Sequence, residues 1–130
     1  MLQNNLAVYG LNDRVLAVNA DIVDLLNQSY DVDVVFLDPP WNPSGQPWHK
    51  SLHKLMLHLS GKPVHGIVNQ IFSKHSKAAV VIKVPRNFDF QKFITSVPDV
   101  LVMIHRVSEF YVVLCSLPQS VDAKCHQKCV

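Results

Sequence analysis

An Asp-Pro-Pro-Trp sequence at residues 38–41 holds the residue types with the clearest chemical potential in this chain. The two prolines remove two N–H donors and fix the backbone, but their carbonyl oxygens remain as hydrogen-bond acceptors. A carboxylate beside such carbonyls can accept both N–H groups of an exocyclic amine and leave its nitrogen lone pair directed at an electrophile. The tryptophan adds a flat face on which a nucleobase can stack. The pattern predicts a site that alkylates an amino group on a ring.

The same four residues also have a plainer interpretation. Asp-Pro-Pro is a common turn sequence, and a single tryptophan is more often core or surface filler than a base platform. Their placement favours the chemical interpretation. They follow the apolar run Val32–Leu37, which is typical of a strand buried on both faces. Ligands of open α/β sheets bind outside the carboxyl ends of such strands.

Strand patterns alternate with helix patterns along the rest of the chain, which predicts an α/β fold. The expected helices are Met1–Gly10, Ile22–Gln28, Leu52–Leu59, Val64–Lys74 and Asp89–Ser96. The expected strands are Arg14–Val18, Val32–Leu37, Ala78–Val84, Val100–His105 and Phe110–Leu117. The last two strands are joined by a tight connection, so we expect a mixed sheet that closes with an antiparallel hairpin.

Composition limits the class of protein. The chain has 130 residues, of which 48% are hydrophobic and 17% charged, as in a globular domain, and its net charge of +2 demands no polyanionic partner. No apolar run approaches the roughly 18 residues that span a bilayer, and the N-terminus lacks the pattern of a secretory signal. Three cysteines make a disulfide framework improbable. We therefore expect an intracellular protein without a membrane partner.

Histidines and cysteines suggest metal binding only weakly. His49 and His53 are four residues apart, a spacing that can place two ligands on one helix face, and His58 follows nearby. No further ligand has a matching spacing. Cys125 and Cys129 provide only one pair of thiols in a tail. We expect no metal centre.

Three stretches, in the right order, resemble one family. Asp-Pro-Pro-Trp after a hydrophobic strand is similar to motif IV, [DNS]-P-P-[YFW], of the class I S-adenosylmethionine-dependent amino methyltransferases. Asn4–Asp21 and Asp31–Trp41 resemble segments of the trimethylguanosine synthases, which methylate the N2 amine of the RNA cap guanine. Val81–Phe90 is similar to the strand that ends in their Leu-Pro-Arg-Asn pattern. The resemblance covers roughly residues 3–117 and implies the C-terminal part of a Rossmann-like class I methyltransferase sheet.

The resemblance assigns a methyltransferase-like domain to residues 1–118 and a tail to residues 119–130. Six matching positions lie on the acceptor side of the family's site: Asp38, Pro39, Pro40, Trp41, Arg86 and Asn87. The first three match the catalytic loop that orients the accepting amine. Trp41 matches the tryptophan that stacks on 7-methylguanine, and the Arg-Asn pair matches a turn near the substrate.

On the cofactor side, Asp21 matches the acid that receives the amino group of the adenine of S-adenosylmethionine, and Ala20 and Ile22 flank that contact. The family's glycine-rich turn is not in this sequence, because none of its four glycines forms a Gly-x-Gly cluster. The resemblance thus implies that the first helix and first two strands are absent. Their absence exposes one edge of the Val32–Leu37 strand. We expect a second copy, another chain or a rearranged N-terminal segment to cover that edge.

The acceptor base stays open at this point. Cap enzymes usually have Ser-Pro-Pro-Trp followed by Gly-Gly, whereas this chain has Asp38 and then Asn42-Pro43. Asp at the first position is shared with adenine-modifying relatives. The first hypothesis is an RNA methyltransferase acting on the cap guanine N2, with capped RNA as partner. The alternatives are a truncated, non-catalytic binding subunit and a nucleic-acid adenine-N6 methyltransferase. Lys50, Lys54, Lys83 and Arg86 could line a phosphate path, although isolated lysines are usually solvated surface.

Overall fold

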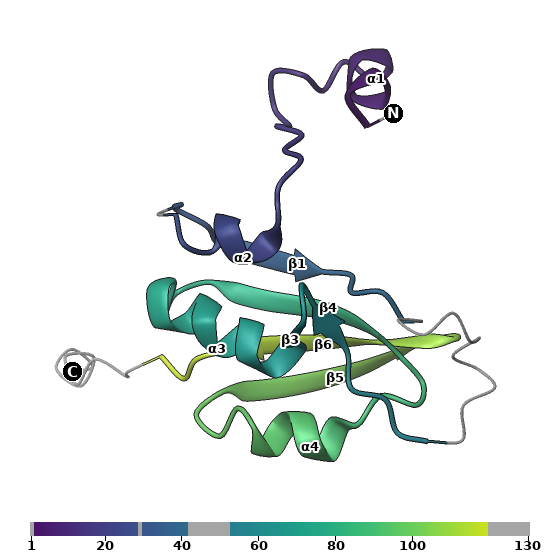
Figure 1. Ribbon diagram of the computed structural model, residues 1–130, viewed down its shortest axis with the longest axis vertical. Coiled ribbons are helices and arrows are strands. Elements are labelled where there is room, and N and C mark those ends of the chain that lie inside the picture. The colour runs from purple at the N-terminus through teal and green to yellow at the C-terminus, as the bar shows by residue number, and fades with distance from the viewer. Residues whose placement is uncertain (1, 29, 42–52, 120–130) are drawn as a thin grey trace, which may run out of the picture.

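The computed structural model describes residues 2–28, 30–41 and 53–119. At its centre is a four-stranded sheet with the order β1-β4-β6-β5 (Figure 1). The strands are β1 (Val34–Leu37), β4 (Ala79–Pro85), β5 (Leu101–Val107) and β6 (Phe110–Ser116). β1 and β4 are parallel, whereas β4 pairs with β6 and β6 with β5 in antiparallel fashion. The predicted α/β class, with a mixed sheet and a closing antiparallel hairpin, is confirmed.

Four helices and a small hairpin accompany the sheet in the described residues. The helices are α1 (Leu2–Val8), α2 (Ile22–Leu25), α3 (Val64–Lys74) and α4 (Phe90–Thr95), and the hairpin consists of β2 (His58–Leu59) and β3 (Lys62–Pro63). Two helices begin at aspartates whose carboxylates accept backbone N–H groups. Asp21 caps α2 through Val23 N at 2.8 Å, and Asp89 caps α4 through Lys92 N at 3.1 Å. None of the described helices has the length and apolar character required to cross a membrane.

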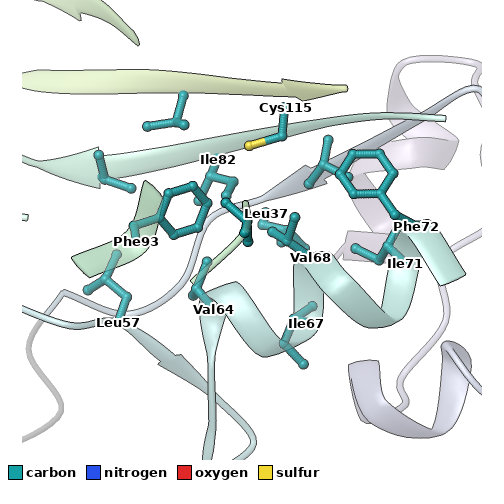
Figure 2. Packing of buried hydrophobic residues seen from close by; sticks show 14 of the residues in the cluster. Leu37, Leu57, Val64, Ile67, Val68, Ile71, Phe72, Ile82, Phe93 and Cys115 are labelled. Carbon is teal, nitrogen blue, oxygen red and sulfur yellow. The ribbon is translucent and has the colours of Figure 1, made fainter. Parts of the chain in front are cut away.

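The hydrophobic core lies between one face of the sheet and the helices α3 and α4 (Figure 2). On α3, apolar residues recur at helical spacing, so one stripe of the helix is buried. On β4, every second residue points to the same face. The fully buried members from these two elements are Val64, Ile67, Val68, Ile71, Val80, Ile82 and Val84. Phe93 of α4 and Val113 of β6 close the same cluster.

The opposite side of the sheet, which we call the open face, carries the alternate residues. Paired positions place Phe36, Val81, Leu114 and Met103 in one row across the four strands. At the two ends of this row, Phe36 is 60% exposed and Met103 is 53% exposed. The prediction that Val32–Leu37 is buried on both faces is wrong, because only the face towards α3 is covered within the described part of the chain.

Two predicted elements are also wrong. Residues 14–18 form no strand, and Leu16 is 86% exposed, because no described strand lies beside this segment to pair with it. The described part of the predicted helix Leu52–Leu59 is extended. Leu55 bridges Phe88, and His58–Leu59 form β2. Leu55, Leu57 and Leu59 recur at a period of two and turn towards the core, which marks an extended chain.

The turn after β2 explains why the chain reverses there. Ser60 has φ +50° and Gly61 has φ +76°, so both residues of the two-residue loop are left-handed. This backbone joins two strands in a tight hairpin and suits a Ser-Gly pair. The hairpin brings Pro63 to the start of α3, where its missing N–H is harmless.

Candidate functional site

The Asp-Pro-Pro-Trp sequence lies at the carboxyl end of β1, as predicted. The side chain of Asp38 is 51% exposed. Pro39 is fully buried, Pro40 is exposed, and Trp41 is half-buried at the margin of the core. The indole Nε1 of Trp41 donates a hydrogen bond to the backbone oxygen of Lys83 at 3.3 Å. Pro39 therefore anchors the segment, while the carboxylate and part of the indole face outward.

Lys83 completes this site, although the sequence suggested it only as one of several residues along a phosphate path. Its Nζ lies 3.5 Å from Asp38 Oδ2 and 5.2 Å from the ring centroid of Trp41. It also lies 5.2 Å from the ring centroid of Phe110, at the start of β6. The sequence signal is a single lysine inside the apolar run of β4. Because Leu37 is aligned with Ile82, the next pair along the two strands is Asp38 and Lys83.

Arg86 and Asn87 follow the carboxyl end of β4, which is the same end of the sheet as Asp38, because β1 and β4 are parallel. Arg86 Nη2 donates a hydrogen bond to the backbone oxygen of Ser108 at 2.9 Å and pairs with Glu109 Oε1 at 3.0 Å. Both partners form the β5–β6 turn. Asn87 Nδ2 donates to the backbone oxygen of His53 at 3.3 Å. Both side chains therefore support neighbouring loops, and their substrate role stays a prediction.

Asp21 performs a structural task at the position predicted to hold adenine. Besides capping α2, its two carboxylate oxygens both accept from Ser60 Oγ at 2.7 Å. The hydrogen bond from Ser60, followed by that from Val23 N, lowers the pKa of Asp21 below its ordinary value. Ala20 is exposed, and Ile22 is half-buried against the core. Sequence reasoning missed Ser60, although its Ser-Gly pair is a turn signal.

Within residues 2–28, 30–41 and 53–119, no group of three metal-ligating side chains comes together. His49, Cys125 and Cys129 lie outside these ranges. A broad, open hollow at the amino ends of β1 and β4 is lined by Tyr30, Lys74 and Lys77 among others. It lies at the opposite end of the sheet from Asp38 and contains none of the predicted site residues. The candidate site is therefore the carboxyl end of β1 and β4.

Comparison with known proteins identifies the family. Residues 1–122 match the family described as RNA cap guanine-N2 methyltransferase. An uncharacterized protein of Acanthamoeba polyphaga mimivirus is 32% identical over 94 residues, which cover 71% of this chain and 35% of that protein. The chain thus spans about a third of the length of this curated relative. No solved structure matches the chain. Because the family match extends over nearly all of the chain, and the Asp-Pro-Pro-Trp site lies where the resemblance implies, the chain belongs to the RNA cap guanine-N2 methyltransferase family, that of the trimethylguanosine synthases.

Proposed function

We propose that this chain forms the acceptor side of an S-adenosylmethionine-dependent RNA methyltransferase that modifies the N2 amine of a cap guanine. One observation carries the proposal. This chain belongs to the family, and its half-exposed Asp38 carboxylate and partly exposed Trp41 ring lie together at the carboxyl end of β1. A base stacked on that ring brings its exocyclic amine towards the carboxylate and the proline carbonyls.

The chemistry required of these residues is orientation. Asp38 and one of the proline backbone oxygens accept the two N–H groups of the amine, which directs the nitrogen lone pair away from the protein. S-adenosylmethionine would supply an electrophilic methyl group, and the electrons of its broken sulfur–methyl bond would stay on the sulfur of the departing neutral thioether. When the nitrogen forms its new bond to carbon, one of its protons leaves, and Asp38 is the carboxylate placed to receive it. Trp41 contributes by stacking, which fixes the plane of the base.

The residues predicted for the adenine of S-adenosylmethionine are compatible with that role. Asp21 accepts from two donors in the structure, Val23 N and the single hydroxyl proton of Ser60, whose Oγ lies 2.7 Å from both carboxylate oxygens. A carboxylate offers about four lone-pair positions, so there is room for an adenine amino group. Ala20 and Ile22 would contact the ring on either side.

We expect the purified chain to bind S-adenosylmethionine weakly or not at all, because the sequence provides only the adenine side of the pocket. Isothermal titration calorimetry measures this directly. A dissociation constant in the low micromolar range, on the order of −8 kcal/mol, would contradict the expectation and show that the chain rebuilds the pocket.

The proposal is tested by identifying the product. The chain is incubated with isotopically labelled S-adenosylmethionine and an RNA that carries a 7-methylguanosine cap, and the digested nucleosides are analysed by mass spectrometry. With S-adenosylmethionine in large excess, to offset its weak binding, we expect slow labelling of the guanine N2 and its loss in Asp38→Asn. Asp99→Asn, a matched change at an exposed aspartate before β5, should leave transfer unchanged. Label on adenine N6 would support the adenine-specific alternative, and cap binding without any transfer would support the binding subunit.

For assembly, we propose that a second copy of the chain covers the outer edge of β1. In the described ranges β1 pairs only with β4, so its other edge presents unpaired N–H and C=O groups beside the exposed side chains of Val34 and Phe36. Two such edges can pair about a two-fold axis. Sedimentation velocity should detect a dimer that Phe36→Lys disrupts. A strict monomer at all concentrations would contradict this, and would leave another chain as the partner.

A further inference from the structure

Three side chains from two other segments surround the ammonium group of Lys83 at the carboxyl end of the open face. Lys83 lies on β4, Phe110 begins β6, and Asp38 and Trp41 follow β1. Because Lys83 is paired with Val112, Phe110 is its diagonal neighbour on the same face of the sheet. The register of β1 and β4 places Asp38 on that face too. The strand pairing itself therefore builds this arrangement, which we call the cation corner.

The two rings of the cation corner are arranged to bind a positive charge rather than to hold a base stacked between them. The centroids of Trp41 and Phe110 are 6.3 Å apart, and their planes are tilted by 46°. Rings tilted in this way form an open angle, so no base can lie parallel to both. Lys83 Nζ lies 5.2 Å from each centroid, within the range of about 6 Å at which a ring attracts a cation. The Asp38 carboxylate adds a negative charge at 3.5 Å.

The ammonium group of Lys83 thus lies among the groups that a positively charged base would need for its own binding. Guanine methylated at N7 carries a delocalised positive charge, whereas unmodified guanine is neutral. A cationic base stacked on Trp41 meets the edge of Phe110 and the carboxylate of Asp38, which are the groups that now hold the ammonium. Two positive charges repel at such short range, so the cation corner accepts one of them at a time. The side chain of Lys83 is 33% exposed and flexible enough to turn outward.

We infer that Lys83 is an internal competitor that sets the selectivity of the site, and that Phe110 is the second ring that recognises a cationic, N7-methylated guanine. This inference rests on the proposed function, because it assumes that a cap guanine stacks on Trp41. It adds two specificity residues and a mechanism of exchange: the base displaces the Lys83 ammonium from the two rings and from Asp38. Only a ligand that replaces the lost cation–ring and ion-pair contacts makes the exchange favourable, which discriminates against the neutral base.

The binding test uses 7-methylguanosine 5′-monophosphate and guanosine 5′-monophosphate, which differ in the charge of the base and share the same phosphate. Trp41 fluorescence reports binding in a Trp48→Phe background. We expect Lys83→Met to bind the methylated nucleotide roughly three- to tenfold more tightly than the parent, because the competing cation is gone. Lys83→Arg retains that charge and should bind less tightly than Lys83→Met. Lys77→Met, a matched change at the exposed lysine before β4, should leave the affinity unchanged.

Phe110→Leu tests the second ring. It should reduce the preference for the methylated over the unmethylated nucleotide at least threefold, with a smaller effect on the neutral base. Equal losses for both nucleotides would mean that Phe110 merely packs against Trp41, and would overturn its assignment. Unchanged or weaker binding of the methylated nucleotide by Lys83→Met would overturn the competition.

A second measurement separates the failure of this inference from that of the proposed function. In the ligand-free chain labelled with ¹³C-lysine, the ε-methylene protons of Lys83 should be shifted upfield by the two rings, and Trp41→Leu or Phe110→Leu should remove part of the shift. Saturation with the methylated nucleotide should return the signal towards its random-coil position. Binding that leaves the signal upfield would overturn the exchange while the proposed function stands. No binding of the nucleotide by any form would overturn both.

Discussion

The two faces of the sheet are built from similarly apolar residues and meet very different surroundings. On the face towards α3 and α4, Val80, Ile82 and Val84 are completely buried. On the open face, Val34 and Phe36 are each 60% exposed. Strands of parallel and mixed α/β sheets are commonly apolar on both sides because helices cover both faces. The difference shows that an apolar run predicts a strand but does not predict whether other elements cover both of its faces. The open face is therefore an exposed apolar surface of the kind that binds a partner.

The largest expected effect on stability comes from replacing a phenylalanine on the covered face, compared with the same replacement on the open face. Phe93→Ala removes a fully buried ring from the core and should lower the free energy of unfolding by about 3–5 kcal/mol. Phe36→Ala removes a largely exposed ring and should cost less than about 1 kcal/mol in the monomer. Urea denaturation of both variants at low protein concentration measures the difference.

Concentration dependence serves as the control for this pair. If a second copy covers the open edge, the cost of Phe36→Ala should grow with protein concentration, whereas that of Phe93→Ala should not. Equal losses at high dilution would contradict the comparison, because they would mean that Phe36 is buried within one chain.

Trp41 lies where the two faces meet, since it packs against the core cluster and also contacts Lys83 and Phe110. Trp41→Ala should weaken binding of 7-methylguanosine ligands by about 1–3 kcal/mol. Because the ring is half-buried, we expect a smaller loss of about 1–2 kcal/mol in stability. Trp41→Phe retains a stacking face and loses the hydrogen bond to the Lys83 carbonyl. Its binding should fall between those of the parent and Trp41→Ala.

One outcome would assign Trp41 to the core alone. If Trp41→Ala lost about 3–5 kcal/mol of stability while ligand binding at low temperature stayed intact, the base platform would be excluded. Calorimetric titration and thermal unfolding of the same preparation provide the two quantities.

The sequence was a good guide wherever local pattern and burial agreed. The helix Val64–Lys74 and the final hairpin appeared nearly as predicted, because their apolar periods match the core that buries them. The Asp-Pro-Pro-Trp sequence also lies at the carboxyl end of its strand, as predicted, since two consecutive prolines remove the N–H groups that would continue the strand pairing. The predicted strand at residues 14–18 failed because pairing depends on a neighbour that local pattern cannot supply. The contacts of Lys83 with Asp38 and Phe110 could not be predicted, because only the register of the sheet brings these residues together.

The stability of the fold should decrease in acid because of one histidine on the helix that covers the sheet. His65 lies on α3, and burial, followed by the charges of Lys92 and His58, lowers its pKa below the ordinary 6.5. Its Nδ1 is buried without a hydrogen-bond partner in the described ranges. The unfolded chain therefore binds this proton more readily, so the stability should be fully present above pH 6.5 and decrease as the pH falls below it.

His65→Gln removes this titration and keeps a polar side chain of similar size. We expect its free energy of unfolding to depend less steeply on pH between 7.5 and 5.5 than that of the parent, as measured by urea denaturation. The difference between the two slopes is the informative quantity, because the substitution leaves every other ionisable group in place. Identical slopes would mean that His65 is as well solvated in the folded chain as in the unfolded one.

The smallest effect concerns the rim of the site, where Arg86 holds the β5–β6 turn and is also predicted to contact substrate. The ion pair with Glu109 joins side chains that are 44% and 69% exposed, so breaking it should cost less than about 1 kcal/mol of stability. Glu109→Gln removes the ion pair and leaves the cation of Arg86 in place, which makes it the matched control for Arg86→Ala.

If Arg86 contacts a cap phosphate, Arg86→Ala should weaken binding of capped RNA and reduce its salt dependence by about one ion. Glu109→Gln should then bind as tightly as the parent or more tightly, because the arginine is released from a competing carboxylate. Similar small losses of stability with unchanged RNA binding in both variants would show that Arg86 only clamps the turn, and that the site consists of the groups facing the open side of β1 and β4.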